Sequence, residues 1–441
     1  MNEAVANTGQ TMTSILVKSS SIAKLNAPTI YRLPNGLTII AEQIPIEAVN
    51  LNVWLNVGSA IESDEINGMA HFLEHMVFKG TARLKSGDFE KQIEERGAVT
   101  NAATSQDYTH YYITTAPKDF ADLAPLQMDV VLNASIPDDG FDRERSVVLE
   151  EIRRSEDNPR RRNYQRMTDL AFDKLPYRRQ VLGPATVIEN LAAQQMRDFH
   201  HQWYQPSSMT AVAIGNLPVE TLISVVKDSF NHLESKTRGQ EPTRSQHTSE
   251  KPFNEIVRQE YVDTSLQQAR LTMLWRVPGL DDLSKTYALD VLANVLGHGR
   301  TARLVQDLRE GRGLVTSISA SNMTYRHQGL FCVSAHLPVE NLEVVEAAIV
   351  QHIQKLQAEF VTDFELSRVR TQVANHFIFR NETPSDRSGL YGYYQSQIGS
   401  LEPAFNYPTH IQSLTTAELQ AAAQTYLPTS AYGIVTIKPG E

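Results

Sequence analysis

Hydrophobic and polar residues alternate along short runs in the first half of the chain, and longer segments with helical spacing separate these runs. Period-two alternation predicts strands over residues 31–43, 50–58, 101–116 and 209–214. Apolar residues three and four positions apart predict helices over residues 68–79, 119–134 and 141–156, near Ser86 and after Pro159. The first half is therefore predicted to form a sheet covered by helices.

The second half of the chain repeats this order of patterns. Its predicted strands cover residues 255–261, 268–276, 315–321, 329–337 and 432–438. Its predicted helices cover residues 284–296, 340–358, 362–380 and 384–398. Such a repetition indicates an internal duplication. We therefore predict an α+β fold with two homologous domains, each an antiparallel-rich sheet covered by helices.

A polar segment, residues 233–252, separates the two halves and contains almost no apolar residue after Leu233. This composition predicts an exposed linker. The predicted domains are then residues 29–232, which carry the candidate metal site described below, and residues 253–441. The length of 441 residues agrees with more than one packed core, because single cores stop growing well below that size.

The charge balance excludes some classes of partner. With 41 Lys plus Arg against 51 Asp plus Glu, the net charge is -10, and we expect neither nucleic acid nor an anionic membrane as partner. No run approaches the roughly 18 apolar residues of a membrane span. The single cysteine, Cys332, excludes an intrachain disulfide and a CxxC metal site, and its apolar neighbours predict a buried thiol.

The first 28 residues are rich in Ser and Thr and lack the apolar core of a secretory signal. The first arginine is Arg32, whereas a mitochondrial transit peptide would be rich in arginine. We expect residues 1–28 to form a short disordered arm, and we expect a cytoplasmic protein.

The sequence His-Phe-Leu-Glu-His occupies residues 71–75 inside a predicted helix. At 100° per residue, His71, Glu74 and His75 fall on one arc, and the neighbouring apolar residues lie opposite. Two imidazoles four residues apart can bind one Zn²⁺, and the glutamate between them can reach a water on that ion. The alternative is a solvated polar helix face. We favour the metal site, because the HxxEH pattern is rare by chance.

A catalytic zinc needs three protein ligands and one open position, so a further donor is expected elsewhere. In the predicted helix after residue 140, Glu144 and Glu151 share an apolar stripe, whereas Glu150 points about 100° away from Glu151. A carboxylate buried on such a stripe needs a cation or N–H donors as partners. Glu144 and Glu151 are therefore candidates for the metal site. The alternative is an exposed acidic helix.

These motifs resemble the pitrilysin-type, or inverzincin, zinc metallopeptidases, in the branch of mitochondrial processing peptidase and its bacterial two-subunit relatives. The similarity covers nearly the whole chain and includes the segments GAVTNAATSQDYTHYY, ERSVVLEEIRRSEDNP and GRTARLVQDLREGRGLV. It implies one Zn²⁺ per chain, bound by His71, His75 and Glu151. It also implies that Glu74 is the general base and that Glu144 is a carboxylate supporting a ligating histidine. The implied fold is two α/β roll domains facing each other across a closed chamber, with zinc on the first.

The resemblance further implies where a peptide substrate binds. In this family an edge strand with the sequence Asn-Ala, here Asn101 and Ala102, receives the substrate as an added β-strand. Main-chain hydrogen bonds then supply the affinity and tolerate varied side chains. The alternative is an ordinary strand end.

The chain departs from this family in its second half. Active single-chain relatives carry an Arg and a Tyr seven residues apart that bind the substrate carbonyl; here Arg309 is present, but Thr316 stands at the Tyr position. A Thr hydroxyl is too short to replace a phenol, and losing one such donor costs about 2.7 to 4 kcal/mol. We therefore expect a heterodimer with a homologous zinc-less subunit that carries both residues. The alternative is that Tyr325 replaces the missing phenol.

A second departure concerns specificity. In mitochondrial processing peptidase, acidic residues that read a substrate arginine stand at the positions of Arg161 and Gln165. The run RRRNYQR, residues 160–166, is basic instead, so we do not expect arginine-directed cleavage. The alternative is that this run is a solvated helix face.

Two hypotheses follow. The first is a zinc endopeptidase, the catalytic subunit of an enzyme that hydrolyses short unfolded peptides in a closed chamber. The second is a non-catalytic scaffold or core-like subunit of a larger complex. The intact set of His71, Glu74, His75 and Glu151 favours the first, because a scaffold has no need of all four. A zinc hydrolase acting on other substrates is disfavoured by the Asn-Ala strand.

Overall fold

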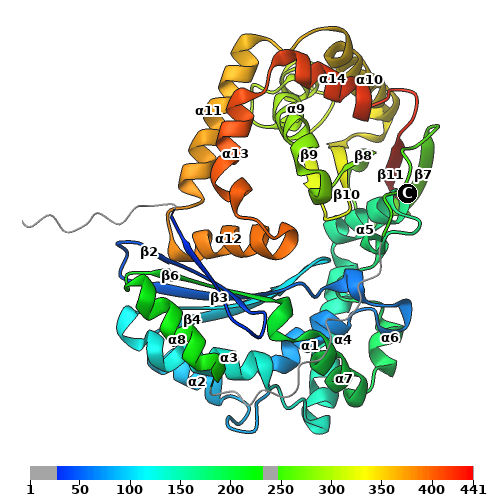
Figure 1. Cartoon of the computed structure of the whole chain (residues 1–441). Coiled ribbons are helices and arrows are strands. Elements are labelled where there is room, and N and C mark those ends of the chain that lie inside the picture. The colour runs from blue at the N-terminus through cyan, green and yellow to red at the C-terminus, as the bar shows by residue number, and fades with distance from the viewer. Residues whose placement is uncertain (1–26, 232–246, 441) are drawn as a thin grey trace, which may run out of the picture.

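The computed structural model describes residues 27–231 and 247–440, which form two sheets with their helices (Figure 1). The first sheet has the order β1 (Thr29–Arg32), β2 (Thr38–Gln43), β6 (Met209–Gly215), β3 (Val49–Leu55), β5 (Thr109–Thr115), β4 (Val99–Thr104). The second sheet has the order β7 (Val257–Asp263), β11 (Gly433–Pro439), β8 (Ala269–Pro278), β10 (Gln328–Leu337), β9 (Ser317–Thr324).

The helices of the first half are α1 (Met69–Val77), α2 (Asp88–Glu95), α3 (Phe120–Leu132), α4 (Asp138–Asp157), α5 (Pro159–Ala171), α6 (Ala185–Asn190), α7 (Ala193–Trp203) and α8 (Val219–Asn231). Those of the second half are α9 (Tyr287–Gly297), a π-helix (Val305–Gly311), α10 (Leu342–Ala358), α11 (Asp363–Phe379), α12 (Pro384–Ile398), α13 (Glu402–Ser413) and α14 (Thr416–Tyr426). Short 3₁₀ turns join several of these elements.

The two sheets have the same topology once β1 is set aside. Strand β2 runs parallel to β6 as β7 runs parallel to β11, and every other neighbouring pair is antiparallel in both sheets. The predicted internal duplication and the α+β class are therefore confirmed. The predicted disordered arm and most of the predicted linker lie outside the described residues, and residues 247–252 form neither helix nor strand.

One face of each sheet packs on helices of its own half. In β3, Val49, Leu51 and Val53 face the first core, which also contains apolar residues of α1, α3, α4, α7 and α8. The second core joins β8 and β10 to α9, α10, α11 and α14 in the same way. Alternate residues of each strand point to the opposite face of its sheet, as the pleat requires.

The opposite face of each sheet is covered by a helix from the other half. Helix α12 lies across the first sheet, where Tyr391 packs with Trp54 and Val212 (Figure 1). Helix α5 packs reciprocally on the second sheet, where Met167 lies in one apolar cluster with Leu274. The buried Cys332 belongs to that cluster, as its sequence context predicts. This exchange of helices fixes how the halves sit together.

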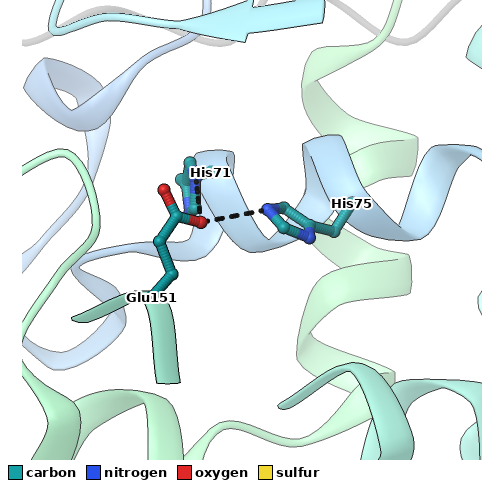
Figure 2. A group of neighbouring side chains, drawn as sticks. All are labelled: His71, His75 and Glu151. Carbon is teal, nitrogen blue, oxygen red and sulfur yellow. Dashed lines mark ion pairs between the residues drawn. The ribbon is translucent and has the colours of Figure 1, made fainter. Parts of the chain in front are cut away.

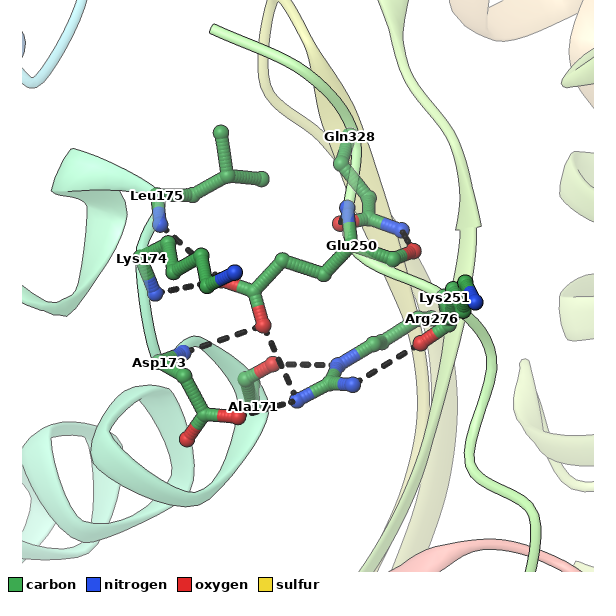
Figure 3. Close-up of polar contacts among 8 residues, drawn as sticks. All are labelled: Ala171, Asp173, Lys174, Leu175, Glu250, Lys251, Arg276 and Gln328. Carbon is green, nitrogen blue, oxygen red and sulfur yellow. Dashed lines mark hydrogen bonds and ion pairs between the residues drawn. The ribbon is translucent and has the colours of Figure 1, made fainter.

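A half-buried cluster of polar contacts around Glu250 also joins the two halves, just after the described chain resumes at residue 247 (Figure 3). The Glu250 carboxylate accepts hydrogen bonds from the backbone N–H groups of Asp173, Lys174 and Leu175 at 3.0, 2.8 and 2.9 Å, and pairs with Arg276 at 3.1 Å. These N–H groups follow α5 of the first half, whereas Arg276 lies on β8 of the second. The N–H groups and Arg276 outweigh the effect of burial and hold the pKa of Glu250 below its usual range.

Several predicted elements differ in the structure. The strand predicted over residues 31–43 is a hairpin of β1 and β2, because Gly36 adopts a φ of 93° in the turn between them. The strand predicted over residues 101–116 is likewise a hairpin, in which Ser105 N–H bonds the Tyr108 carbonyl at 2.8 Å. Helices α6, α7, α8, α13 and α14 were not predicted. No described helix is long and apolar enough to cross a membrane.

Candidate metal centre

Helix α1 carries both histidines of the HFLEH sequence and is anchored at its first turn. Gly68 precedes the helix with a φ of 99°, and a Cβ on it would lie 2.6 Å from the Leu182 carbonyl oxygen. The buried Glu62 carboxylate accepts hydrogen bonds from Gly68 N–H at 2.8 Å and Ala70 N–H at 2.7 Å. Burial raises the pKa of Glu62 to about 7 despite these bonds. The sequence analysis did not single out Glu62.

Helix α4 packs against α1 and presents two carboxylates to it. Buried Val148 and Ile152 fix the orientation of α4, so that Glu144 and Glu151, two turns apart, face α1. Val147 falls on the same stripe of the helical wheel but is 50% exposed, so the buried apolar stripe of α4 is narrower than its sequence indicates. On the other side of α4, Glu150 binds Arg153 at 2.8 Å and Arg154 at 2.9 Å.

His71, His75 and Glu151 converge on one point from two helices (Figure 2). The Nε2 atoms of both histidines lie 3.6 Å from the same Glu151 oxygen, Oε2. This is too long for a normal hydrogen bond. It is close to the separation of about 3.3 to 3.5 Å between two ligands of a tetrahedral Zn²⁺ with bonds of about 2.0 to 2.1 Å. Two neutral imidazoles and a carboxylate are also a donor set that zinc favours.

The two imidazoles differ in pKa: against the effect of burial, hydrogen bonds to Glu151 and Glu144 raise the pKa of His75, whereas the pKa of His71 is lowered. Burial, with the neighbouring His75, lowers the pKa of His71 to about 4, so His71 is neutral at pH 7. His75 Nδ1 lies 2.9 Å from Glu144 Oε1, and a proton held on Nδ1 leaves the Nε2 lone pair free. Glu144 also binds Lys79 Nζ at 2.7 Å. Against the effect of burial, Lys79 and His75 hold the pKa of Glu144 below its usual range.

Glu74 lies beside this group without belonging to it. Its carboxylate accepts a short hydrogen bond from the Thr104 hydroxyl, and Thr104 is the last residue of β4. Burial raises the pKa of Glu74, which Thr104 partly opposes. A buried carboxylate with a raised pKa is suited to accept and return a proton near neutral pH.

Strand β4 is the edge of the first sheet, and among the described strands only β5 pairs with it. Asn101 is exposed and Ala102 half-buried on this strand. The Ala102 N–H donates to Asn101 Oδ1 at 2.9 Å. Both residues predicted to contact substrate thus lie on the strand whose last residue, Thr104, contacts Glu74.

The structure does not bring the candidate residues of the second half to this group. Arg309 lies in the π-helix and pairs with Glu310 at 2.6 Å, and Thr316 donates to Gln268 Oε1 at 2.8 Å. Tyr325 packs between the halves, where its hydroxyl lies 2.6 Å from that of Tyr164. The phenol of Tyr325 is therefore already used in a structural contact.

Two family models match the chain. The model described as insulinase, peptidase family M16, matches residues 38–185, and the model described as peptidase M16 inactive domain matches residues 190–373. The chain belongs to peptidase family M16. The predicted resemblance is thus confirmed, and the described residues contain one group with metal-binding geometry, in the half that the first model covers.

Relatives of the chain extend over almost its whole length. An uncharacterized zinc protease of Mycobacterium tuberculosis is 28% identical over 94% of this chain and 93% of that protein. A probable mitochondrial-processing peptidase subunit beta of Arabidopsis thaliana is 27% identical over 96% and 81%. The crystal structure of a protease from Helicobacter pylori superposes with a TM-score of 0.87 at 26% identity, over 93% of this chain and 99% of that one.

Proposed function

We propose that this chain is the zinc-bearing catalytic subunit of an endopeptidase that hydrolyses short unfolded peptides. The observation that carries the proposal is the convergence of His71, His75 and Glu151 at 3.6 Å spacings, beside Glu74. Three ligands leave one position of a tetrahedral ion open, as in catalytic rather than structural zinc sites. When bound, zinc would polarise the scissile carbonyl and lower the pKa of the attacking water.

Residues of the chain carry out proton transfer, orientation of a ligating histidine and alignment of the peptide. Glu74 accepts the proton of the attacking water and passes it to the leaving amine, and the Thr104 hydroxyl holds its carboxylate in place. Glu144 keeps the His75 proton on Nδ1, so that Nε2 faces the metal position. The free edge of β4, including Asn101 and Ala102, aligns the peptide by main-chain hydrogen bonds. The peptide is thereby led along β4 toward Glu74, which contacts the last residue of the strand.

The proposal includes a homologous partner subunit that lacks zinc and supplies an Arg and a Tyr. Thr316 leaves this chain without the phenol, and Tyr325 is bonded to Tyr164. Arg309 does not contact the metal group. A partner closing over the first half would complete a chamber for the peptide and supply the missing donors. One relative is itself named as a subunit, which supports pairing.

The second candidate remains a non-catalytic scaffold or core-like subunit. The family model on the second half is described as an inactive domain, which is compatible with this alternative. Catalysis is favoured over a scaffold role because the base, Glu74, is retained and contacts the last residue of an edge strand.

A cytoplasmic location is also part of the proposal, and cell fractionation tests it.

Hydrolysis of unstructured peptides of about 10 to 30 residues tests the proposal. The zinc-loaded chain is assayed alone and with a homologous subunit carrying the Arg/Tyr pair. We expect cleavage at an ordinary enzymatic rate, on the order of 1 s⁻¹ or faster, only in the mixture. Glu74→Gln should abolish it, whereas Glu150→Gln, an exposed glutamate on α4, should not. No cleavage in either preparation would favour the scaffold.

A further inference from the structure

A basic cavity of about 460 Å³ lies next to the metal group, between the end of α4, the start of α5 and residues 179–182. Its lining includes five arginines, namely Arg160, Arg161, Arg162, Arg166 and Arg179. This is the basic run for which sequence left two interpretations, a change that removes arginine-directed cleavage or a solvated helix face. The partners of the five guanidinium groups distinguish between them.

Two of the five arginines are neutralised within the protein. Arg162 binds Asp263 at 2.6 Å, and Arg179 binds Asp64 at 2.6 Å. Among the described residues, Arg160, Arg161 and Arg166 have no carboxylate within ion-pair distance. One acidic residue, Glu156, shares the lining. The cavity wall is therefore locally positive in a chain whose net charge is -10.

The three guanidinium groups without a carboxylate partner differ in exposure: Arg160 and Arg161 are exposed, whereas Arg166 is half-buried. The Arg166 guanidinium lies 4.3 Å from the centre of the Tyr261 ring, and its Nη1 is buried without a hydrogen-bond partner among the described residues. Arg161 Nη1 reaches the Ser155 hydroxyl at 3.4 Å. Buried N–H donors without an acceptor are costly, and an anionic oxygen would satisfy them.

Two residues of the cavity wall lie close along the chain to residues of the metal site, one to Glu151 and one to the partner of Glu74. Ser155 in its wall stands one helical turn, about 5.4 Å, after the ligand Glu151 on α4. Gln106 in its wall follows Thr104, the partner of Glu74, by two residues.

We propose that this cavity binds a carboxylate of the peptide substrate, from an Asp or Glu side chain or from the C-terminus. The inference rests on the proposed peptidase function and adds a substrate class to it. Planar guanidinium groups recognise carboxylates through paired hydrogen bonds. An extended peptide advances about 3.3 Å per residue, so the helical turn of about 5.4 Å between Glu151 and Ser155 corresponds to about two residues of a bound peptide.

Peptide binding to the zinc-loaded Glu74→Gln protein, with its partner subunit, tests the inference separately from hydrolysis. Amidated peptides of one unstructured sequence carry a single Glu, or the matched Gln, at each position in turn. We expect the Glu peptide to bind at least tenfold more tightly at one or two positions. This ratio should fall as salt rises, because exposed charges are screened within about 10 Å at 0.1 M.

Two variants show whether the cavity causes the preference. Arg161→Gln should bring the ratio of Gln to Glu dissociation constants close to one, and Arg161→Glu should favour a Lys peptide. Arg153→Gln, which removes an arginine of α4 paired with Glu150, should leave the ratio unchanged. Thermal melting checks that all three variants are folded.

The outcomes separate the cavity from the proposed function. Peptides with a free C-terminus could bind more tightly than amidated ones while Glu and Gln peptides bind equally. If Arg161→Gln removes this difference, the cavity is supported and the C-terminus is the source of the carboxylate. Binding with this charge preference but no cleavage by the active preparation would refute the peptidase and keep the cavity. Cleavage with equal binding of Glu and Gln peptides at every position, and of free and amidated C-termini, would refute the cavity alone.

Discussion

Replacing Glu144 by Gln should weaken zinc binding about tenfold without abolishing it. Glu144 is 12% exposed and accepts from His75 Nδ1 at 2.9 Å and from Lys79 Nζ at 2.7 Å. The Gln side chain keeps an acceptor for Nδ1 but loses the charge. Charge-assisted hydrogen bonds are roughly twice as strong as neutral ones, so about 1 to 1.5 kcal/mol is lost at His75. Lys79 is partly exposed, so the loss of its ion pair with Glu144 adds little to this free-energy cost.

A loss of about 1.4 kcal/mol corresponds to a tenfold rise in the dissociation constant, at the low end of the range for residues that support metal ligands. Competition with a chromophoric chelator at pH 7 measures this constant. Glu150→Gln is the matched control, because Glu150 lies on the same helix but binds Arg153 and Arg154. Unchanged zinc affinity in Glu144→Gln, or equal losses in both variants, would refute the role assigned to Glu144.

Three further predictions concern the framework of the site. Glu250→Gln should lower the free energy of unfolding by about 1 to 3 kcal/mol at pH 7, since three backbone N–H groups and Arg276 lose a charged acceptor. Because the pKa of Glu250 is depressed, this stabilisation is present above the ordinary pKa of 4.5 and is lost on acidification; denaturant titrations that show an equal difference at pH 7 and pH 3 would contradict it. Gly68→Ala should cost about 2 kcal/mol or more and weaken zinc binding, because the residue has a φ of 99° and its Cβ would meet the Leu182 carbonyl; an unchanged melting temperature would contradict this. Tyr325→Phe should lower stability by about 1 kcal/mol through the lost Tyr164 contact while peptide hydrolysis is retained; a loss of hydrolysis in the folded variant would instead make Tyr325 the missing phenol.

Local periodicity was enough to predict the parts of the site that lie on single helices. The i, i+4 spacing placed His71 and His75 on one face of α1, and the seven-residue spacing placed Glu144 and Glu151 on one side of α4. The packing of α4 on α1 is tertiary, so the helical wheel predicted which residues would face a partner without identifying that partner. Lys79 and Thr104 were missed for the same reason.

Other features had weaker signals or none. Glu62 lies in the loop before α1, and its carboxylate accepts hydrogen bonds from the backbone N–H groups at the start of that helix. Nothing in the sequence around Glu62 indicates these contacts. Helix α14 begins with a capping box of Thr415 and Glu418, a sequence signal that would have predicted it. Helix α13 contains Pro408 in its interior, which disfavours a helix in sequence. The exchange of α5 and α12 between the halves depends on three-dimensional packing alone.

The zinc content of purified protein tests the central claim most directly. It is measured by elemental analysis for the wild type, Glu151→Ala and the control Glu150→Ala, which shortens the neighbouring glutamate outside the metal group. We predict about one Zn²⁺ per chain in the wild type and in Glu150→Ala, and little or none in folded Glu151→Ala. Full zinc occupancy in Glu151→Ala, or no zinc in the wild type after growth with zinc, would contradict the assignment of this site.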